Sequence, residues 1–312
     1  IGVDIYQSYL NIHNQETINF PCNALKKLFF ISLKYADDYE KVFQLKKVSA
    51  LIISHDDYYH SNIIAKLAYK FDTPVFLVSR SRVMLTTRPF SRKNLYQNLS
   101  NIFENFDDYE KLKFSNIGKS FMLKRLRGET VKELPYIKEN IHHENKNKDF
   151  NNIKNKDSTN KTKLDVVVFV HDFVDTPHAI GMLNYCDFYE WLKNVCEEIL
   201  KAGYNCFLKS HIDSSSLTRK TVKKVSQMFN NVIILNEDTS ATQIIELADL
   251  IITAYGTCST EFPYHGIPVI CTDVNRFSSF KFVYSLKRDE KLHQVLIKRD
   301  FYPLNSISQI QE

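Results

Sequence analysis

LDVVVFVHDFVDTPH, residues 164–178, is the stretch that decides the fold of the second half of the chain. Residues 164–170 form a short apolar run rich in valine, which is typical of a parallel strand buried on both faces. Histidine and aspartate follow this run at once. The stretch therefore predicts a buried strand with ionisable side chains at its carboxyl end.

Strands and helices alternate from there to residue 272. Gly203 stands where a helix-ending glycine is expected, and Ser240 where a helix-capping serine is expected. We predict helices at 187–202, 216–229 and 240–248, a helix start at 259–264, and further strands at 205–209, 232–235, 250–254 and 268–272. This alternation implies βαβ units and a parallel sheet.

The first half of the chain shows a less regular version of the same pattern. We predict buried parallel strands at 50–54 and 74–78, and helices at 23–36, 61–70 and 109–126. The opening residues also allow an early strand, which the sequence does not place. The predicted fold class is α/β, with two Rossmann-like domains facing a cleft, where ligands usually bind.

An Asn/Lys-rich segment separates the two halves. It is poor in apolar residues and cannot bury enough surface to offset the entropy lost on ordering. We predict a first domain at 1–138, a linker or disordered loop at 139–163, a second domain at 164–282 and a helical tail at 283–312.

Composition and charge exclude several classes of function. The hydrophobic fraction of 44% and the charged fraction of 25% are those of a soluble globular protein, and no apolar run suits a transmembrane helix. Most of the net charge of +5 comes from lysines in 138–163, so a basic nucleic-acid-binding face is not expected. The six cysteines form no CxxC pair, which predicts free thiols in a reducing compartment.

The first residues contain no signal peptide, so we expect a cytoplasmic protein. Because the chain opens with Ile1 rather than methionine, we also expect residues upstream. Whether such residues contain a targeting segment is a question that the sequence leaves open.

The strongest local signal is ITAYGTCSTEF, residues 252–262. A predicted strand ends here, a turn containing Gly256 follows, and a helix is expected to begin near Ser259. The N–H groups and positive dipole end of a helix suit a phosphate, and Thr257 and Ser259 add hydroxyl donors. Glu261 can accept hydrogen bonds from a ribose or an acceptor sugar. The alternative is an ordinary strand-turn-helix connection with Ser259 as its cap.

Four ionisable side chains follow the strand at 164–170, namely His171, Asp172, Asp175 and His178. A histidine can act as a general acid or base near neutral pH, and a nearby carboxylate can fix its tautomer or raise its pKa. A metal site is a competing interpretation, but the spacing is not that of a closed zinc site, and we expect no metal. A polar loop whose side chains cap turns is the third interpretation.

Two further predicted strands end in side chains of the same kind. After the strand at 205–209, Lys209 can neutralise a diphosphate and His211 can contact a base or a phosphate. His55 follows the strand at 50–54. Each loop alone is compatible with a solvated loop. Their shared position favours a site, because ligands bind beyond the carboxyl ends of parallel strands.

Together these stretches resemble bacterial capsule and surface polysaccharide biosynthesis proteins, which have a GT-B-like architecture. The resemblance spans most of the chain. It is carried by Asp4-Ile-Tyr-x-Ser-Tyr-Leu10, Ile53-Ser-His-x-x-Tyr58, His171-x-Phe-x-Asp-x-Pro-His178, Asp187-Phe-Tyr-x-Trp191, Lys209-x-His211, Tyr255-Gly-Thr-x-x-x-Glu261 and Gly266-Ile-Pro-Val269. Ser210 and Ile212 stand where the family pattern has proline, so the likeness is weaker in that loop.

The resemblance implies kinship with CDP-glycerol glycerophosphotransferases and with the sugar transferases that build capsule. It implies transfer from a nucleotide-activated donor to a glycan or lipid-linked glycan acceptor, with no further cofactor. The second domain would bind the donor through Lys209, His211, Tyr255, Gly256, Thr257, Ser259 and Glu261, and the first domain would face the acceptor.

The same resemblance leaves the catalytic base open among four residues. One of His55, His171, Asp172 and Asp175 would deprotonate the acceptor hydroxyl, and His178 would line the same cleft. A peripheral association with the inner membrane also stays open. The alternatives to a glycosyltransferase are a CDP-glycerol-type phosphotransferase, a nucleotide-sugar epimerase and a non-catalytic scaffold of polysaccharide assembly.

Overall fold

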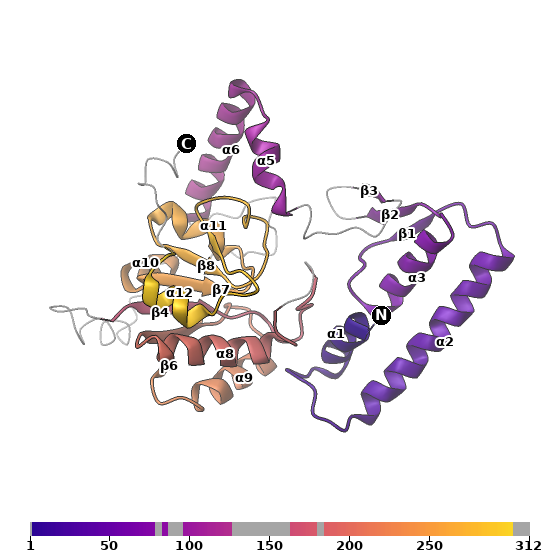
Figure 1. The fold of residues 1–312 in the computed structure, drawn as a ribbon, viewed down its shortest axis with the longest axis horizontal. Helices are drawn as coiled ribbons and strands as arrows, with labels where there is room; N and C mark the ends of the chain where they lie inside the picture. Colours follow the sequence, from indigo (N-terminus) through magenta and orange to yellow (C-terminus); the bar gives the residue numbers. More distant parts are fainter. Residues whose placement is uncertain (1, 79–82, 87–95, 127–162, 180–183, 302–312) are drawn as a thin grey trace. The chain divides into compact units, whose positions relative to one another are not determined.

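The structure is a computed structural model that describes residues 2–78, 83–86, 96–126, 163–179 and 184–301 (Figure 1). The chain divides into two compact units. Unit 1 comprises Ile1–Arg92 and Asp172–Tyr189, and unit 2 comprises Lys93–His171 and Glu190–Glu312. The predicted linker lies outside the described residues except for its last residue, Lys163. A cleft between the two domains stays a prediction.

Unit 2 is built on a six-stranded sheet in which all the described strand pairs are parallel. The order is β6-β5-β4-β7-β8-β9. The first strand along the chain is therefore central, the next two lie on one side of it and the last three on the other. This is the doubly wound, Rossmann-like order, which confirms the predicted α/β class. The strands are β4 (Asp165–Phe169), β5 (Asn205–Lys209), β6 (Val232–Ile234), β7 (Leu250–Thr253), β8 (Val269–Cys271) and β9 (Tyr284–Ser285).

Helices cover both faces of this sheet, because alternate side chains of a strand point to opposite faces. Val167, Phe207 and Ile251 belong to one buried cluster with side chains of α10 (Ala241–Leu247) and α11 (Cys258–Glu261). On the other face, Cys206 contacts Cys196 of α8 (Phe188–Lys201), with 3.9 Å between the sulfur atoms. In Figure 1, α8 and α9 (Ser216–Ser226) lie on one side of the strands and α10 and α11 on the other.

Two helix ends that the sequence predicted are confirmed. Gly203 follows α8 with φ +81°, the left-handed conformation that ends many helices. Ser240 begins α10 with a capping box, in which its hydroxyl accepts the Gln243 N–H and the Gln243 side chain accepts the Ser240 N–H.

The sheet of unit 2 continues past the predicted domain boundary at residue 282. β9 pairs with β8, with Tyr284 opposite Ile270, and α12 (Leu292–Lys298) follows. His293 of α12 contacts Glu198 of α8 at 2.5 Å. Residues 283–301 are therefore part of the second unit and not a separate tail.

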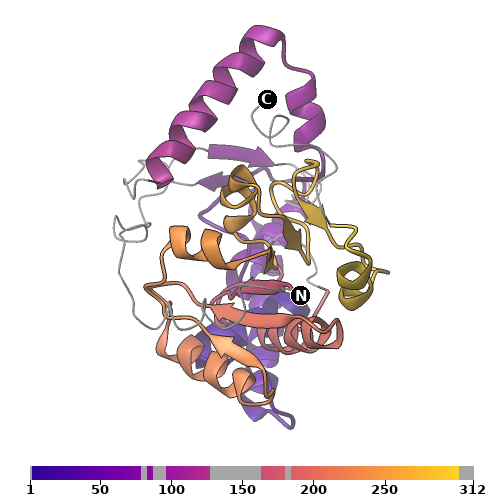
Figure 2. The ribbon, with the colours of Figure 1, turned by 90° about the vertical axis from the view of Figure 1, so that its left-hand side faces the viewer.

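The helix predicted at 109–126 is confirmed as α6 (Asp108–Leu126). It is part of unit 2, whereas the sequence had placed it in the first domain. It forms a helical hairpin with α5 (Leu99–Glu104), which Figures 1 and 2 both show. The Ser100 N–H at the start of α5 donates to Ser279 Oγ at 3.1 Å. Contacts far apart in the sequence thus place this hairpin with the second sheet.

Unit 1 contains a small mixed sheet of order β1-β2-β3. β1 (Leu51–Ile53) and β2 (Val75–Val78) are parallel and are joined by α3 (Tyr59–Lys70), and β3 (Val83–Thr86) is antiparallel to β2. Phe43 of α2 (Asn23–Leu45), Ala68 and Val75 form the core of one face. The Rossmann-like character expected of the first domain is confined here to the β1–α3–β2 unit.

Three predictions for unit 1 are wrong in part. The opening residues form a helix, α1 (Gly2–His13), and not a strand. β1 is an edge strand whose Ile52 is 71% exposed, so it is not buried on both faces. α2 extends nine residues past the predicted helix end, to Leu45.

Within the described residues, no helix is both long enough and apolar enough to cross a bilayer.

A matched pair of substitutions tests the assignment of the central and edge strands. Ile252→Ala on β7 removes a fully buried side chain and should cost about 2–5 kcal/mol. Ile234→Ala on β6, where the side chain is 42% exposed, should cost about 1 kcal/mol or less. Urea unfolding of the full chain measures both. Equal losses would contradict the strand order.

Candidate functional site

The carboxyl ends of β5, β4 and β7 are neighbours in the sheet. Phe169 of β4 pairs with Lys209 of β5, and Val168 pairs with Ile252 of β7. The strand order reverses between β4 and β7, and such a switch point is where doubly wound sheets bind ligands. The strand ends that the sequence singled out in this half therefore gather at one edge of unit 2, which we call the donor edge (Lys209–His211, His171 and 253–261).

His171 is packed between aromatic rings and the end of β7. Its ring centroid lies 4.8 Å from that of Tyr255 and 5.8 Å from that of Trp191. Nε2 lies 3.2 Å from Thr253 Oγ1, and the Tyr255 N–H points at it with an N–N distance of 3.5 Å. Burial lowers the pKa of His171 to about 4, so the ring is neutral at pH 7. A ring with so low a pKa is a weak base, and its contacts suit a structural role better than that of a catalytic base.

The turn after β7 differs from the predicted phosphate loop in two respects. The helix α11 has four residues, Cys258–Glu261, and its N-cap is Thr257, so Ser259 lies inside the helix. Ser259 is fully buried, donates from Oγ to the Gly256 carbonyl and accepts from Asn275 Nδ2 at 3.1 Å. Ser259 therefore holds the turn and does not face a ligand here, whereas Thr257 is exposed.

Gly256 is required by packing and not by its backbone conformation. The glycines with positive φ among the described residues are Gly203 and Gly266. A Cβ on Gly256 would instead lie 2.8 Å from Thr253 Oγ1 and 3.3 Å from Cys258 Sγ. A side chain at this position is therefore disfavoured by its neighbours.

Lys209, the residue predicted to neutralise a diphosphate, is buried. Its Nζ donates to the carbonyls of Ser210 at 2.8 Å and of Glu237 at 2.7 Å. Burial lowers its pKa to about 8, against the raising effect of Glu237 and Asp238. The ammonium group therefore ties the loop after β6 to the end of β5, while keeping a positive charge at the donor edge at pH 7.

His211 and Glu261 remain accessible at this edge. His211 is exposed, and its Nδ1 accepts the Asp213 N–H at 3.1 Å, so the neutral ring carries its proton on Nε2. Glu261, at the end of α11, and Tyr255 are half-buried. The groups that can reach a ligand are thus Thr257, Tyr255, His211 and Glu261.

In unit 1, α1 holds two of the predicted loops together. Tyr6 donates to Asp187 Oδ2 at 2.5 Å, and Asn11 Nδ2 donates to the Val174 carbonyl at 3.1 Å. Ser8 Oγ accepts the Tyr59 N–H at 2.9 Å. Burial and the Asp187 hydrogen bond raise the pKa of Tyr6, which keeps this hydroxyl protonated. Loop 54–60, Val174 and Asp187 therefore share one helix as their support.

The same loops bring His55 and Asp175 into one neighbourhood. Tyr58 packs its ring against that of His55, with centroids 5.6 Å apart. Burial raises the pKa of Tyr58 first, and the negative charges of Asp175 and Asp57 raise it further. Asp175 is exposed, and its Oδ1 accepts the Thr176 N–H at 2.8 Å. His55 is half-buried, with Nδ1 2.7 Å from Ser54 Oγ.

Two other predicted residues of this loop have local roles in the structure. His178 Nε2 lies 3.0 Å from the Cys186 carbonyl, and burial lowers its pKa. Asp172 Oδ1 accepts the Val174 N–H at 3.3 Å. His55 and His178 belong to unit 1, and His171, His211 and Glu261 to unit 2. The predicted single cavity that these five would share stays a prediction.

Several residues of the site were assigned no role by sequence reasoning. Thr253, Trp191 and Asn275 are buried beneath the donor edge, and Tyr6 and Asn11 support the loops of unit 1. Trp191 Nε1 donates to Thr272 Oγ1 at 2.7 Å. The segment of α1 was part of the family resemblance, but no role was assigned to it. For Thr253 and Asn275 no local pattern offered a signal.

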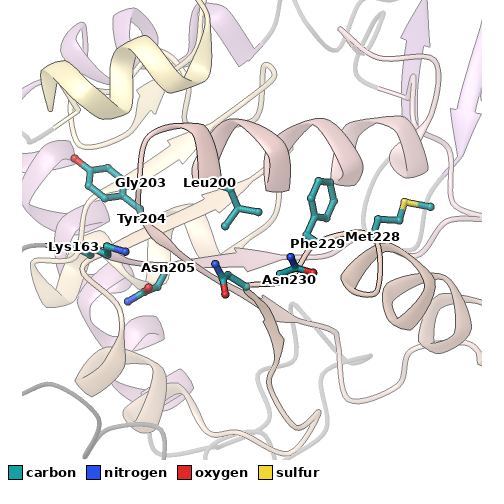
Figure 3. A pocket seen from close by; sticks show the side chains of 9 residues that line it. Lys163, Leu200, Gly203, Tyr204, Asn205, Met228, Phe229 and Asn230 are labelled. Atoms are coloured by element: carbon teal, nitrogen blue, oxygen red, sulfur yellow. The ribbon is translucent and has the colours of Figure 1, made fainter.

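A surface hollow lies at the other end of β5. It has a volume of about 360 Å³ and is lined by Leu200, Tyr204, Asn205 and Phe229 among others (Figure 3). Asn205 begins β5 and Lys209 ends it, so the hollow is at the amino edge of the sheet.

Across the part of the chain that the structure describes, no three His, Cys, Asp or Glu side chains gather to hold a metal ion.

No family model and no curated protein matches the sequence. Among solved structures, the chain is similar to the beta Kdo 2,4 transferase KpsC of Thermosulfurimonas dismutans, at TM-score 0.48 and 11% identity over 84% of this chain and 86% of that one. It is also similar to the UDP-GlcNAc 2-epimerase of Neisseria meningitidis, at TM-score 0.31 and 12% identity over 93% and 77%.

A further similarity is to MnaA of S. aureus in a structure with UDP, at TM-score 0.32 and 11% identity over 99% of this chain and 91% of that one. A sugar transferase and a nucleotide-sugar epimerase are thus among the similar structures. Similarities this low do not assign an activity, and the strand order of unit 2 carries the fold assignment.

The buried position of Lys209 can be tested by stability. Lys209→Ala should destabilise the chain by about 1–3 kcal/mol, because it leaves the carbonyls of Ser210 and Glu237 without the ammonium donor. Lys209→Met keeps the apolar stem and should recover only the packing part of the loss. Urea unfolding measures both variants. A Lys209→Ala chain as stable as the parent would contradict the buried position.

The neutral state of His171 predicts a dependence of stability on pH. The folded pKa of about 4 lies below the ordinary 6.5, so between these values the unfolded chain binds more protons. The stabilisation, roughly 3 kcal/mol, is complete above pH 6.5 and is lost as pH falls to 4. His171→Gln does not titrate, so its stability should fall less over this range. Urea unfolding measures both proteins across this pH range. If the free energy of unfolding falls equally with pH in the parent and in His171→Gln, the assignment is contradicted.

Proposed function

We propose that the chain is a glycosyltransferase that takes a sugar from a nucleotide-activated donor and binds the donor's nucleotide at the donor edge. The observation that carries the proposal is the strand order of unit 2. It sets the ends of β5, β4 and β7 side by side at a switch point, where doubly wound sheets bind nucleotides. The side chains exposed at this edge have the chemistry that a nucleotide requires.

The donor would meet three kinds of group there. The Thr257 hydroxyl can donate to a phosphate oxygen, and the half-buried Glu261 carboxylate can accept from ribose hydroxyls. His211, with its proton on Nε2, can donate to a phosphate or a base. Lys209 adds positive charge from below without leaving its two carbonyl partners. Together they would stabilise the negative charge that grows on the departing phosphate.

The predicted cleft between the domains would require a base from unit 1 to activate the acceptor. The acceptor oxygen attacks the anomeric carbon, the bond from that carbon to the phosphate oxygen breaks, and the nucleotide leaves with the bonding electrons. The hydroxyl proton passes to a base. His55 and Asp175 are the candidates that the geometry favours, because both lie in the loops that α1 supports and neither is sealed in the core. His171, neutral and packed under the turn after β7, is less suited.

A donor panel tests the proposal. The full chain is titrated with UDP-, GDP-, CMP- and CDP-linked compounds in a thermal-shift assay, and calorimetry then gives the affinity for those that bind. Glycosyl transfer should release the nucleotide and pass the sugar to the acceptor. Release of CMP from CDP-glycerol would indicate the phosphotransferase, and tight binding without turnover would indicate a scaffold. Either outcome would overturn the proposal.

Two variants locate the donor. Thr257→Val should weaken nucleotide binding by about 1.5–3 kcal/mol, the usual range for a hydrogen bond to a charged group. Its hydroxyl makes no capping bond, so the fold should be unaffected. Asn230→Ala, in the hollow at the amino edge, is the control and should leave the affinity unchanged. The reverse result would place the nucleotide in the hollow.

A further inference from the structure

We propose that Thr253 is a positioning residue that sets the geometry of the donor edge through its hydroxyl, without touching the donor. Thr253 ends β7 and is fully buried. It lies directly beneath the turn that contains Gly256 and Thr257. The inference rests on the proposed function for its binding readout, and it has a second readout that does not depend on nucleotide binding.

The hydroxyl of Thr253 joins the turn to His171. Oγ1 accepts the Gly256 N–H at 3.1 Å and lies 3.2 Å from His171 Nε2. The Tyr255 N–H also points at Nε2. Two consecutive N–H groups of the turn are therefore directed inward, toward one hydroxyl and one ring nitrogen, and not outward toward a ligand.

The two backbone donors limit the direction of this chain of hydrogen bonds. A backbone N–H can only donate, so both Thr253 Oγ1 and His171 Nε2 act as acceptors. The hydroxyl proton of Thr253 has two acceptors within reach, His171 Nε2 at 3.2 Å and the Cys258 thiol. We infer that Thr253 donates it to His171, so that the neutral ring carries its own proton on Nδ1. The bonds run from the Gly256 N–H to Thr253 and from the Thr253 O–H to His171.

The same hydroxyl explains the glycine of the turn. A Cβ on Gly256 would meet Thr253 Oγ1 at 2.8 Å, which is closer than such atoms approach each other. Because glycine has no Cβ, the backbone of Gly256 can approach the Thr253 hydroxyl closely enough for its N–H to donate to Oγ1. Thr253 and Gly256 therefore act as one unit, and Thr257, the next residue along, is presented outward by it.

A loss of this hydroxyl should loosen the turn and weaken binding at Thr257. Thr253→Val keeps the shape of the side chain and removes the hydrogen bonds. We expect it to weaken the binding of UDP or CMP, whichever the parent chain binds, roughly tenfold in calorimetry. Thr253→Ser keeps the hydroxyl and should bind within about twofold of the parent. Thr221→Val, a buried threonine of α9, is the control and should have no effect.

The second readout is the ring of His171. Nitrogen NMR of the full chain labelled in histidine, with the signal assigned by its loss in His171→Gln, should show a neutral ring protonated on Nδ1 at pH 6. The Nε2 signal should move toward that of an unbonded nitrogen in Thr253→Val and return in Thr253→Ser. This readout stands even if neither UDP nor CMP binds the parent chain. Failure of every compound in the donor panel would overturn the proposed function alone.

A double-mutant cycle between Gly256 and Thr253 completes the test. Gly256→Ala should lower the urea midpoint of the parent chain, and should lower it less in a Thr253→Ala chain, where the hydroxyl is gone. Equal losses in both backgrounds would show that the two residues are independent. That result would overturn the inference, as would a Thr253→Ser chain that binds nucleotide and shifts the His171 signal like Thr253→Val.

Discussion

The parallel pairing of β4 with β7 is the constraint on which the rest of the structure depends. The chain leaves β4 toward β5 on one side and returns at β7 on the other, so the loops after these two strands diverge around one point. Val167 and Ile251, paired across this line, are fully buried. A slip of one residue would turn these side chains to the opposite face. The register is therefore strongly held, and with it the position of His171 against the turn after β7.

Polar groups at the donor edge divide into those that hold the loops and those that can meet a ligand. Lys209, Ser259, Asn275 and Thr253 are buried, and each is hydrogen-bonded to backbone or side chain. Because an unpaired buried polar group costs free energy, these bonds leave each loop few alternative conformations. Thr257, His211 and Glu261 then project from a rigid base, which is what the recognition of a phosphate or ribose requires.

The sequence predicted the repeating elements of unit 2 closely, because buried parallel strands leave continuous apolar runs and helix ends leave local signatures. The bounds of β5 and the caps at Gly203 and Ser240 match the structure. It could not predict which polar side chains turn inward. Lys209 and His211 stand two residues apart at the same strand end, yet one is buried and the other exposed.

The remaining differences come from partners that are distant in the sequence. Tyr6 meets Asp187, and His171 meets Thr253 82 positions away, so no local window contains either pair. β1 has the apolar run of a buried strand, but its position at the edge of the small sheet leaves Ile52 exposed. The apolar pattern of a segment shows which of its side chains can be buried. Whether they are buried depends on the distant segments that pack against it.

Hydrogen exchange of the full chain, with and without a saturating nucleotide, tests most directly whether the donor edge is the binding site. The account predicts slower exchange in the peptides that cover 209–214 and 253–261 when the nucleotide is bound. The peptides at the amino edge, around 203–206 and 228–231, should exchange at the same rate in both states. Protection at the amino edge with none at the donor edge, for a nucleotide that calorimetry shows to be bound, would contradict the account.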